Sequence, residues 1–428
     1  MDIVSVLVFA VFFGGVLLGI PIIYSLALGA LVPALFINMN MIAVIQKFFV
    51  GVDLFAFMAI PLFIFCGNLL EKSGVSRRLC DFVSALVGWM PGGVAIVTFV
   101  SCMFFGAISG SATATVLAIG SIMVPILLDN KYDERFALAT VAIGGILGPI
   151  IPPSIPMVVY GMNAGVDIGY LFVGGIVPGI IMTILFSIYA YYYGVKHVPE
   201  RRPFVLKDIP KTFVSAIWGL LMPLIILGGI YGGFFTPTEA AAVASVYGII
   251  VGFIIYRELN LKKFYTSLKE SVNSSAMIMF IVAAATAYGF IMTRQQIPNQ
   301  IADIILSITS SPLPFLMLAI VLFLILGTFM ETCTAILIAT PMLLPIVNLL
   351  NIDPLLFGVI MVVSLAIGFV TPPLGLNLYV AAGLRNRSVD FVFNKHLFLL
   401  ITIAIVCVFV ITFVPSLITW LPDLVISK

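Results

Sequence analysis

Small hydroxyl residues gather at two places within apolar stretches of this 428-residue chain. The first group alternates along one short segment and comprises Ser109, Ser111, Thr113 and Thr115. The second group lies in the segment 327–335 and comprises Thr328, Thr332 and Thr334, with Glu331 among them. A carboxylate inside an apolar stretch indicates a functional site. Hydroxyl and carboxylate oxygens bind small hard cations, so the two groups predict two oxygen-only sites for an alkali cation.

Each of the two sets of hydroxyl residues is accompanied by a segment whose helix is broken by proline and glycine. The segments 144–161 and 366–384 correspond at an offset of 220 residues, with Gly148 matching Gly368 and the pair Pro152-Pro153 matching Pro372-Pro373. Proline removes a backbone donor and clashes with the preceding turn, so neither segment forms a continuous helix. Irregular backbone at membrane depth is tolerated only inside protein or beside a cavity.

Two broken helices in matching halves indicate the binding site of a secondary transporter. Unwound carbonyls and hydroxyls suit a cation, whereas half-helix N-termini suit an anion. The pattern therefore predicts cation-coupled anion transport with two symmetry-related cation sites. Close packing of small residues is the alternative for any single Ser or Thr, and proline kinks in a membrane bundle are the alternative for the breaks.

The composition is that of an all-α polytopic membrane protein. Hydrophobic residues make up 62% of the chain and charged residues 9%, which excludes a soluble globular protein. The charges form no basic face for nucleic acid, and the five cysteines show no spacing for disulfides or a metal site. The N-terminal segment has no positively charged region before its apolar run, so we expect the first helix to remain in the mature protein.

Spans of about 20 apolar residues predict the same element order twice. The first half is expected to contain helices 3–19, 21–37 and 48–70, an amphipathic segment 71–89, a re-entrant hairpin 91–128, a broken helix 136–160 and a helix 170–194. The second half is expected to contain helices 213–233, 239–256 and 275–293, an amphipathic segment 296–309, a hairpin 312–350, a broken helix 355–383 and a helix 397–420. Each half crosses the membrane an odd number of times, so the two repeats have inverted topology.

The distribution of basic residues predicts the orientation in the membrane. The loops 71–81, 129–135, 196–211, 257–270 and 384–396 hold 17 of the 20 Lys and Arg residues. Cytoplasmic loops are enriched in these residues. Both termini are therefore expected on the periplasmic side.

An intramembrane enzyme and a channel are the rival function classes. Ser109 resembles a serine nucleophile, but the histidines, His197 and His396, fall in predicted loops and no lysine falls in a predicted span. We therefore expect no enzymatic activity. Matched broken helices favour alternating access over a channel.

Several strings resemble one transporter family over nearly the whole chain. SGSATATVLAIGSIMVP (109–125), GPIIPPSI (148–155), GGFFTPTEAAAVASVYG (232–248) and GFVTPPLGLN (368–377) are similar to the large, DctM-like M subunit of tripartite ATP-independent periplasmic (TRAP) transporters. The resemblance implies an elevator fold of the ion transporter superfamily, in which a transport domain moves against a scaffold with arm helices. The implied division is scaffold and arm 1–90, transport domain 91–195, cytoplasmic linker 196–211, scaffold and arm 212–311, and transport domain 312–428, with 71–90 and 296–311 as the arms.

The resemblance also implies ligands and partners. Carried over by motif, the sodium sites fall on Ser109, Ser111, Gly144 and Gly148 in one half and on Gly327, Glu331, Thr332, Gly368 and Thr371 in the other. Glu331 stands where the first half has Ser111, so the two sites differ chemically. The family takes up organic acids with sodium through the bacterial inner membrane and needs no organic cofactor. It works with a small four-helix membrane subunit (Q type) and a periplasmic substrate-binding protein (P type), here expected as separate polypeptides.

The transported acid is not fixed by the sequence, because sialic acid (N-acetylneuraminate) and C4-dicarboxylates are both family substrates. The candidate substrate ligands are Ser154, Asn163, Asn377 and Tyr379, which offer hydroxyl and amide groups. No fixed positive charge accompanies them, which favours a sugar acid such as sialic acid. A stand-alone sodium-coupled di- or tricarboxylate carrier of the same superfamily is the alternative.

Overall fold

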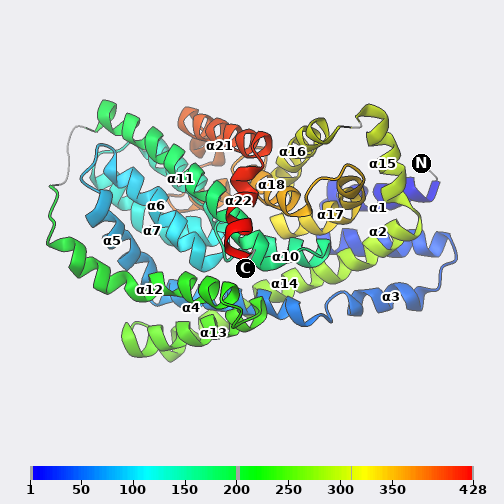
Figure 1. Ribbon diagram of the computed structural model, residues 1–428, viewed down its shortest axis with the longest axis horizontal. Helices are drawn as coiled ribbons and strands as arrows, with labels where there is room; N and C mark the ends of the chain where they lie inside the picture. The colour runs from blue at the N-terminus through cyan, green and yellow to red at the C-terminus, as the bar shows by residue number, and fades with distance from the viewer. Residues whose placement is uncertain (1–2, 199–202, 310, 427–428) are drawn as a thin grey trace.

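The computed structural model describes residues 3–198, 203–309 and 311–426. Within these ranges all regular secondary structure is helical, and ten helices are long and apolar enough to cross a membrane. The expected all-α polytopic fold is therefore confirmed. Figure 1 shows an elongated molecule in which the N-terminus lies at one end and the C-terminus near the middle.

The first half of the chain contains eleven α-helices in the described part. They are α1 (Ile3–Leu17), α2 (Ile22–Phe36), α3 (Met41–Val50), α4 (Ala59–Lys72), α5 (Val75–Val87), α6 (Gly93–Ser109), α7 (Ala112–Asp129), α8 (Glu134–Gly144), α9 (Leu147–Ile150), α10 (Ile155–Ala164) and α11 (Ile168–His197). A short 3₁₀-helix, Phe55–Met58, leads into α4.

The second half contains α12 (Asp208–Tyr231), α13 (Pro237–Ile250), α14 (Leu261–Arg294), α15 (Ile297–Ile308), α16 (Pro312–Phe329), α17 (Thr332–Leu349), α18 (Pro354–Gly368), α19 (Leu376–Gly383), α20 (Val389–Val392), α21 (Lys395–Phe413) and α22 (Ser416–Ile426). A π-helical turn, Val251–Ile255, continues α13. Helix α12 begins inside the segment 196–211 that the sequence predicted as a linker.

Three predicted helices have different bounds in the structure. The segment 48–70 is two helices, because the chain opens between α3 and α4 at Gly51, which packs against Thr286. The segment 397–420 is likewise two helices, separated at Pro415. Helix α14 begins at Leu261, well before the predicted start at 275, and the side chain of Asn260 caps it by accepting the N–H of Lys263 at 2.8 Å.

The two hairpins reverse direction more sharply than expected. Between α6 and α7 only Gly110 and Ser111 are non-helical, and Gly110 adopts the left-handed φ of 61° that glycine allows. Between α16 and α17 only Met330 and Glu331 intervene, both with extended backbone. The interruptions predicted at 106–115 and 327–335 are therefore confirmed in place but are only two residues wide.

Contacts between the two halves occur twice: where a helix of the first half packs on a helix of the second, their counterparts in the other half pack on each other in the same way. Helix α10 packs on α17 as α19 packs on α7, and α4 packs on α13 as α14 packs on α2. Figure 1 shows the hairpin α6–α7 in the left half of the molecule and the hairpin α16–α17 right of centre, with α10 near the middle. This exchange is what two inverted repeats produce.

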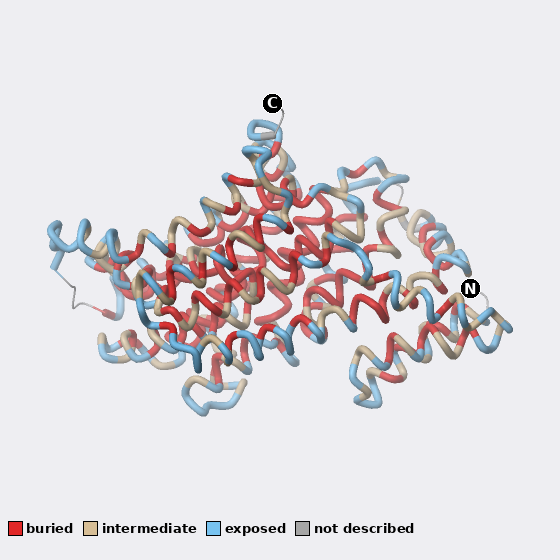
Figure 2. The backbone as a smooth tube through the Cα atoms, turned by 90° about the horizontal axis from the view of Figure 1, so that it is seen from below, coloured by how far each residue is buried: buried red, intermediate tan, exposed pale blue. Residues whose placement is uncertain are grey.

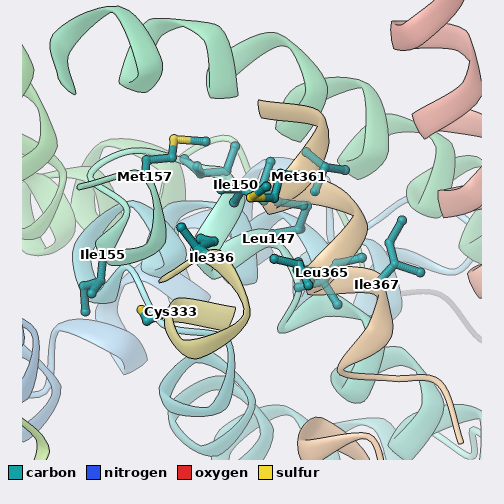
Figure 3. Packing of buried hydrophobic residues seen from close by; sticks show 14 of the residues in the cluster. Leu147, Ile150, Ile155, Met157, Cys333, Ile336, Met361, Leu365 and Ile367 are labelled. Atoms are coloured by element: carbon teal, nitrogen blue, oxygen red, sulfur yellow. The ribbon is translucent and has the colours of Figure 1, made fainter. Parts of the chain in front are cut away.

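The broken helices form the centre of the core. The whole apolar window of the segment Glu134–Ala164 is buried, and α18 is buried from Leu355 to Gly368. Figure 2 shows buried backbone concentrated in the middle of the molecule, and Figure 3 shows side chains of α9, α10, α17 and α18 interdigitating there. A helix that is apolar on all sides must be covered by protein or lipid. Here protein covers the first break completely, whereas Pro373 and Leu374 of the second break are exposed.

Candidate functional site

Pairs of glycines bring each hairpin into contact with a break. A Cβ atom on Gly106 would lie 2.9 Å from the Cα of Gly148, and one on Gly327 would lie 3.0 Å from the Cα of Gly368. Side chains at these positions would force the helices apart. The predicted site glycines Gly148, Gly327 and Gly368 therefore act by letting two backbones approach, one pair in each half of the chain.

The first set of hydroxyl residues forms a hydrogen-bond network at the tip of the α6–α7 hairpin. The Oγ of Ser109 lies 3.0 Å from the Oγ1 of Thr115, which donates to the carbonyl oxygen of Ser111 at 2.8 Å. That carbonyl lies against Gly148, where a Cβ atom would be only 2.4 Å away. The structure thus brings Ser109, Ser111 and Gly148 together. Gly144 lies one turn earlier and packs on the thiol of Cys102.

The second group is built around a carboxylate. Glu331 is the N-cap of α17, and its Oε2 accepts the N–H groups of Cys333 at 2.8 Å and Thr334 at 3.2 Å. The hydroxyls of Thr332 and Thr334 are buried without a hydrogen-bond partner. Buried polar atoms usually have a partner, so these oxygens are available to a ligand. Thr371 uses its hydroxyl hydrogen to donate to the carbonyl of Ile367 at 3.0 Å, which leaves the oxygen able to accept.

A cavity of about 580 Å³ joins the two groups. Ser109, Ser111, Glu331 and Thr332 line it, together with α4 and α14 on the opposite side. Figure 3 shows Ile155 and Cys333, two further lining residues, at neighbouring positions of α10 and α17.

Four helices begin at this cavity. Residues of the first turns of α7, α10, α17 and α19 line it, so the positive ends of four helix dipoles converge there. Ser111, the N-cap of α7, makes no side-chain capping bond, whereas Glu331 caps α17 with its own negative charge. Uncapped N–H groups bind anions, and the carboxylate and hydroxyl oxygens bind cations.

None of the four predicted substrate ligands is among the described residues that line the cavity. Ser154 is the N-cap of α10, where its Oγ accepts the N–H of Met157 at 3.3 Å and donates to the carbonyl of Pro149 at 2.5 Å. These two bonds give Ser154 a local structural role in the first break.

The other three candidates occupy different surroundings. Asn377 is fully buried, and its Nδ2 donates to the carbonyl of Ala142 at 3.2 Å, which ties the second break to α8. The Nδ2 of Asn163 is buried without a partner. Tyr379 is 52% exposed. The structure therefore does not gather these side chains into one site.

Sequence reasoning missed the charged wall of the cavity. Glu71 and Lys72 on α4 and Glu270 on α14 line it, and Lys72 forms an ion pair with Glu270. These residues fell in segments predicted as loops because charge interrupts hydropathy there. The overlooked signal is that Asn68, one helical turn before Lys72, is also polar, and it donates to Ser271 on α14 at 2.8 Å.

Two hairpins and two broken helices that meet around an oxygen-lined cavity define a membrane transporter built from inverted repeats. Sequence comparison agrees, because the chain matches a family of such proteins over residues 9–417. The chain belongs to the family described as "Tripartite ATP-independent periplasmic transporter, DctM component". It is therefore a large permease subunit and a multi-pass protein of the inner membrane.

Curated relatives cover nearly the whole chain. It is 44% identical over 93% of its length to the isethionate TRAP transporter permease protein DctMQ of Oleidesulfovibrio alaskensis, but spans only 63% of that longer protein. It is 37% identical to the C4-dicarboxylate large permease protein DctM of Vibrio cholerae, over 98% of both chains. It is 36% identical to the sialic acid large permease protein SiaM of the same organism, over 95% of both. These relatives are named as transporter permeases, which fits the prediction of a non-enzyme.

Solved structures share the fold at low sequence identity. The Alcanivorax borkumensis YdaH transporter superposes with a TM-score of 0.60 at 15% identity, over 90% of both chains. Neisseria gonorrhoeae MtrF gives a TM-score of 0.59 at 12% identity, over 90% of this chain and 84% of that one. Both comparisons support the architecture alone.

Proposed function

We propose that this chain is the large subunit of a sodium-coupled transporter that takes up an organic anion. The observation that carries the proposal is the cavity, in which two oxygen-rich hairpin tips and the N-termini of four helices meet. One set of groups suits small cations and the other suits an anion. Binding both in one place is the physical basis of coupled transport.

Two sodium ions are proposed as the coupling ions, one at each hairpin tip. Ser109, Ser111 and the backbone around Gly148 supply neutral oxygens in the first half. Glu331 and Thr332, with the backbone around Gly368, supply a charged set in the second half. Gly144 and Thr371 flank these sets as further backbone or hydroxyl donors. Sodium belongs with hard oxygen ligands, and both sets contain only oxygen.

The proposed substrate is a small organic acid. The relatives are named for isethionate, a C4-dicarboxylate and sialic acid, all of which are anions with polar groups. The cavity of about 580 Å³ lies inside the range of about 300–1,000 Å³ that is usual for small-molecule sites. Sialic acid and C4-dicarboxylates remain the candidates from the sequence, and isethionate joins them.

The proposal includes two partners and an orientation. A small four-helix subunit and a periplasmic binding protein are proposed as partners, and the name DctMQ of one relative joins both membrane subunits in one chain. The concentration of basic residues in five loops supports periplasmic termini. An elevator movement of the hairpins and breaks against α4 and α14 is part of the proposal, because residues of both groups of helices line the cavity.

The test is reconstitution into proteoliposomes. The chain, its small subunit and its binding protein should accumulate N-acetylneuraminate, succinate or isethionate when a sodium gradient points inward. Omitting either partner should abolish accumulation. Uptake by the purified chain alone would instead favour a stand-alone carrier of the same superfamily.

A further inference from the structure

A second cavity continues the first on the side of α4 and α14. It has a volume of about 460 Å³ and is lined by Glu71, Lys72, Gly74, Glu258, Lys262, Lys263 and Thr266. Glu71 and Lys72 line both cavities, so they lie at the junction. We call the second cavity the vestibule.

One of the two carboxylates that line the vestibule, that of Glu258, has a partner of its own. Glu258 forms an ion pair with Arg78 at 2.6 Å, and its carbonyl oxygen accepts a hydrogen bond from the Nζ of Lys263 at 2.9 Å. Lys262 is exposed at the start of α14. The two lysines Lys262 and Lys263 outnumber the remaining carboxylate of the vestibule, that of Glu71, so the net charge is positive and attracts anions.

Among the described residues that line the first cavity, Lys72 is the one basic residue. Its side chain is 20% exposed and is held between α4 and α14, whereas the side chain of its partner Glu270 is 52% exposed. A half-exposed carboxylate has room to turn away, and exposed ion pairs contribute little to stability. Exchange of Glu270 for another carboxylate or a sulfonate at Lys72 therefore costs little.

We propose that Lys72 is the anion-binding residue on the α4–α14 side, where the acid group of the substrate replaces Glu270 as it passes between the cavity and the vestibule. This inference rests on the proposed function and adds one contact to it. Glu270 holds the lysine in place when no anion is bound and competes with the anion when one arrives. Lys72 thus binds and positions the anion, while the hairpin tips bind the cations.

The experiment measures binding rather than transport. The purified complex of the chain and its small subunit is titrated with isethionate, succinate and N-acetylneuraminate at fixed sodium, and the rise in melting temperature gives the half-saturating concentration. Lys72→Gln should raise this concentration about tenfold or more, the loss expected for one hydrogen bond to a charged group. Glu270→Gln should lower it, because a competitor is removed, and Lys72→Arg should stay near the wild type.

The two substitutions separate binding from a structural role. Both remove the same ion pair, so a purely structural pair would shift the half-saturating concentration in one direction for both variants. Lys269→Gln is the matched control, since Lys269 is exposed next to Glu270 and lies outside the described lining of both cavities. If Lys72→Gln does not fold, Glu270→Gln still decides, because weaker or unchanged binding contradicts competition.

The outcomes also separate this inference from the proposed function. Shifts in the same direction for Lys72→Gln and Glu270→Gln, or no shift for Lys72→Gln, would overturn the role of Lys72 and leave the proposed function standing. Failure of all three probes to bind the wild-type complex would overturn both.

Discussion

At the level of single residues, the two hairpin tips present different oxygen groups to the cavity. In the first, hydroxyls satisfy one another, as Thr115 donates to the carbonyl of Ser111 at 2.8 Å. In the second, a carboxylate caps α17 and leaves the hydroxyl of Thr332 without a partner. A full negative charge attracts a cation more strongly than neutral oxygens do. We therefore expect the site near Glu331 to bind sodium more tightly.

Ser111→Ala and Thr332→Ala test the cation ligands. Each removes one neutral oxygen from one tip, so each should raise the sodium concentration for half-maximal uptake about fivefold, equivalent to about 1 kcal/mol. Ser121→Ala is the control, because Ser121 lies on the same helix as the first tip but is exposed and bonds to the carbonyl of Ala118. A similar shift in the control would show that the effect is general to α7.

Gly327→Ala tests the close approach of hairpin and break. The new Cβ would lie 2.4 Å from the carbonyl oxygen of Leu365, so the helices must separate. We expect a loss of about 1–3 kcal/mol in the free energy of unfolding, seen as a lower melting temperature. Gly289→Ala should be neutral or stabilising, because nothing lies within 4 Å of its added Cβ and alanine is the better helix former. Equal melting temperatures for the two variants would contradict the packing argument.

The hairpin-tip residues of the candidate site could be predicted from the sequence, whereas the charged residues contributed by α4 and α14 could not. Ser109, Ser111, Glu331 and Thr332 all reach the cavity because local spacing places them at hairpin tips. Lys72 reaches it only because α4 and α14 extend beyond their apolar portions and lie side by side. Such a contact between helices far apart in the chain has no local signal.

At the level of elements, prolines and apolar lengths predicted the order of hairpins and breaks in both halves. These signals act locally, since proline stops a helix wherever it falls. Helix boundaries that depend on tertiary packing were not predicted. The opening at Gly51 is one example, because it exists where the chain meets Thr286 of α14. The early start of α14 is another, since a good N-cap at Asn260 and helix-favouring lysines outweigh the lack of hydropathy.

Cysteine labelling tests the inverted orientation. Ser388 follows the second broken helix in a loop that holds Arg385 and Arg387, and Asn348 lies at the end of α17; both are exposed. Ser388→Cys should react with an impermeant thiol reagent only from the cytoplasm, and Asn348→Cys only from the periplasm. The five native cysteines are buried, so background labelling is low. Labelling of both positions from one side would contradict inverted repeats.

At the level of the whole molecule, carboxylates from both repeats line one cavity. Glu71, Glu270 and Glu331 face a cavity in which Lys72 is the basic lining residue of the described part. The cavity is therefore negative before any ion enters. Sodium binding would offset this charge, and the arriving anion would then meet the helix N-termini instead of bare carboxylates. If the proposed sodium sites are occupied in this way, we expect cation and anion binding to favour each other through the electrostatics of one site.

Charge coupling provides the last prediction. If two sodium ions accompany a monoanion, one net positive charge enters per cycle, and an inside-negative potential of 100 mV adds about 2.3 kcal/mol, or roughly 50-fold, to the accumulation ratio. Proteoliposomes with an imposed potassium diffusion potential should therefore accumulate more isethionate or N-acetylneuraminate than unpolarised ones.

A dianion provides the internal control for this measurement. Two sodium ions carried with fully ionised succinate move no net charge, so its accumulation should depend on the sodium gradient and hardly on the potential. Potassium should not replace sodium, because both tips are compact sets of oxygens drawn together by glycine contacts at Gly148 and Gly368. Equal uptake in sodium-free buffer, or monoanion uptake that ignores the potential, would show that the paired tips do not carry two coupling ions.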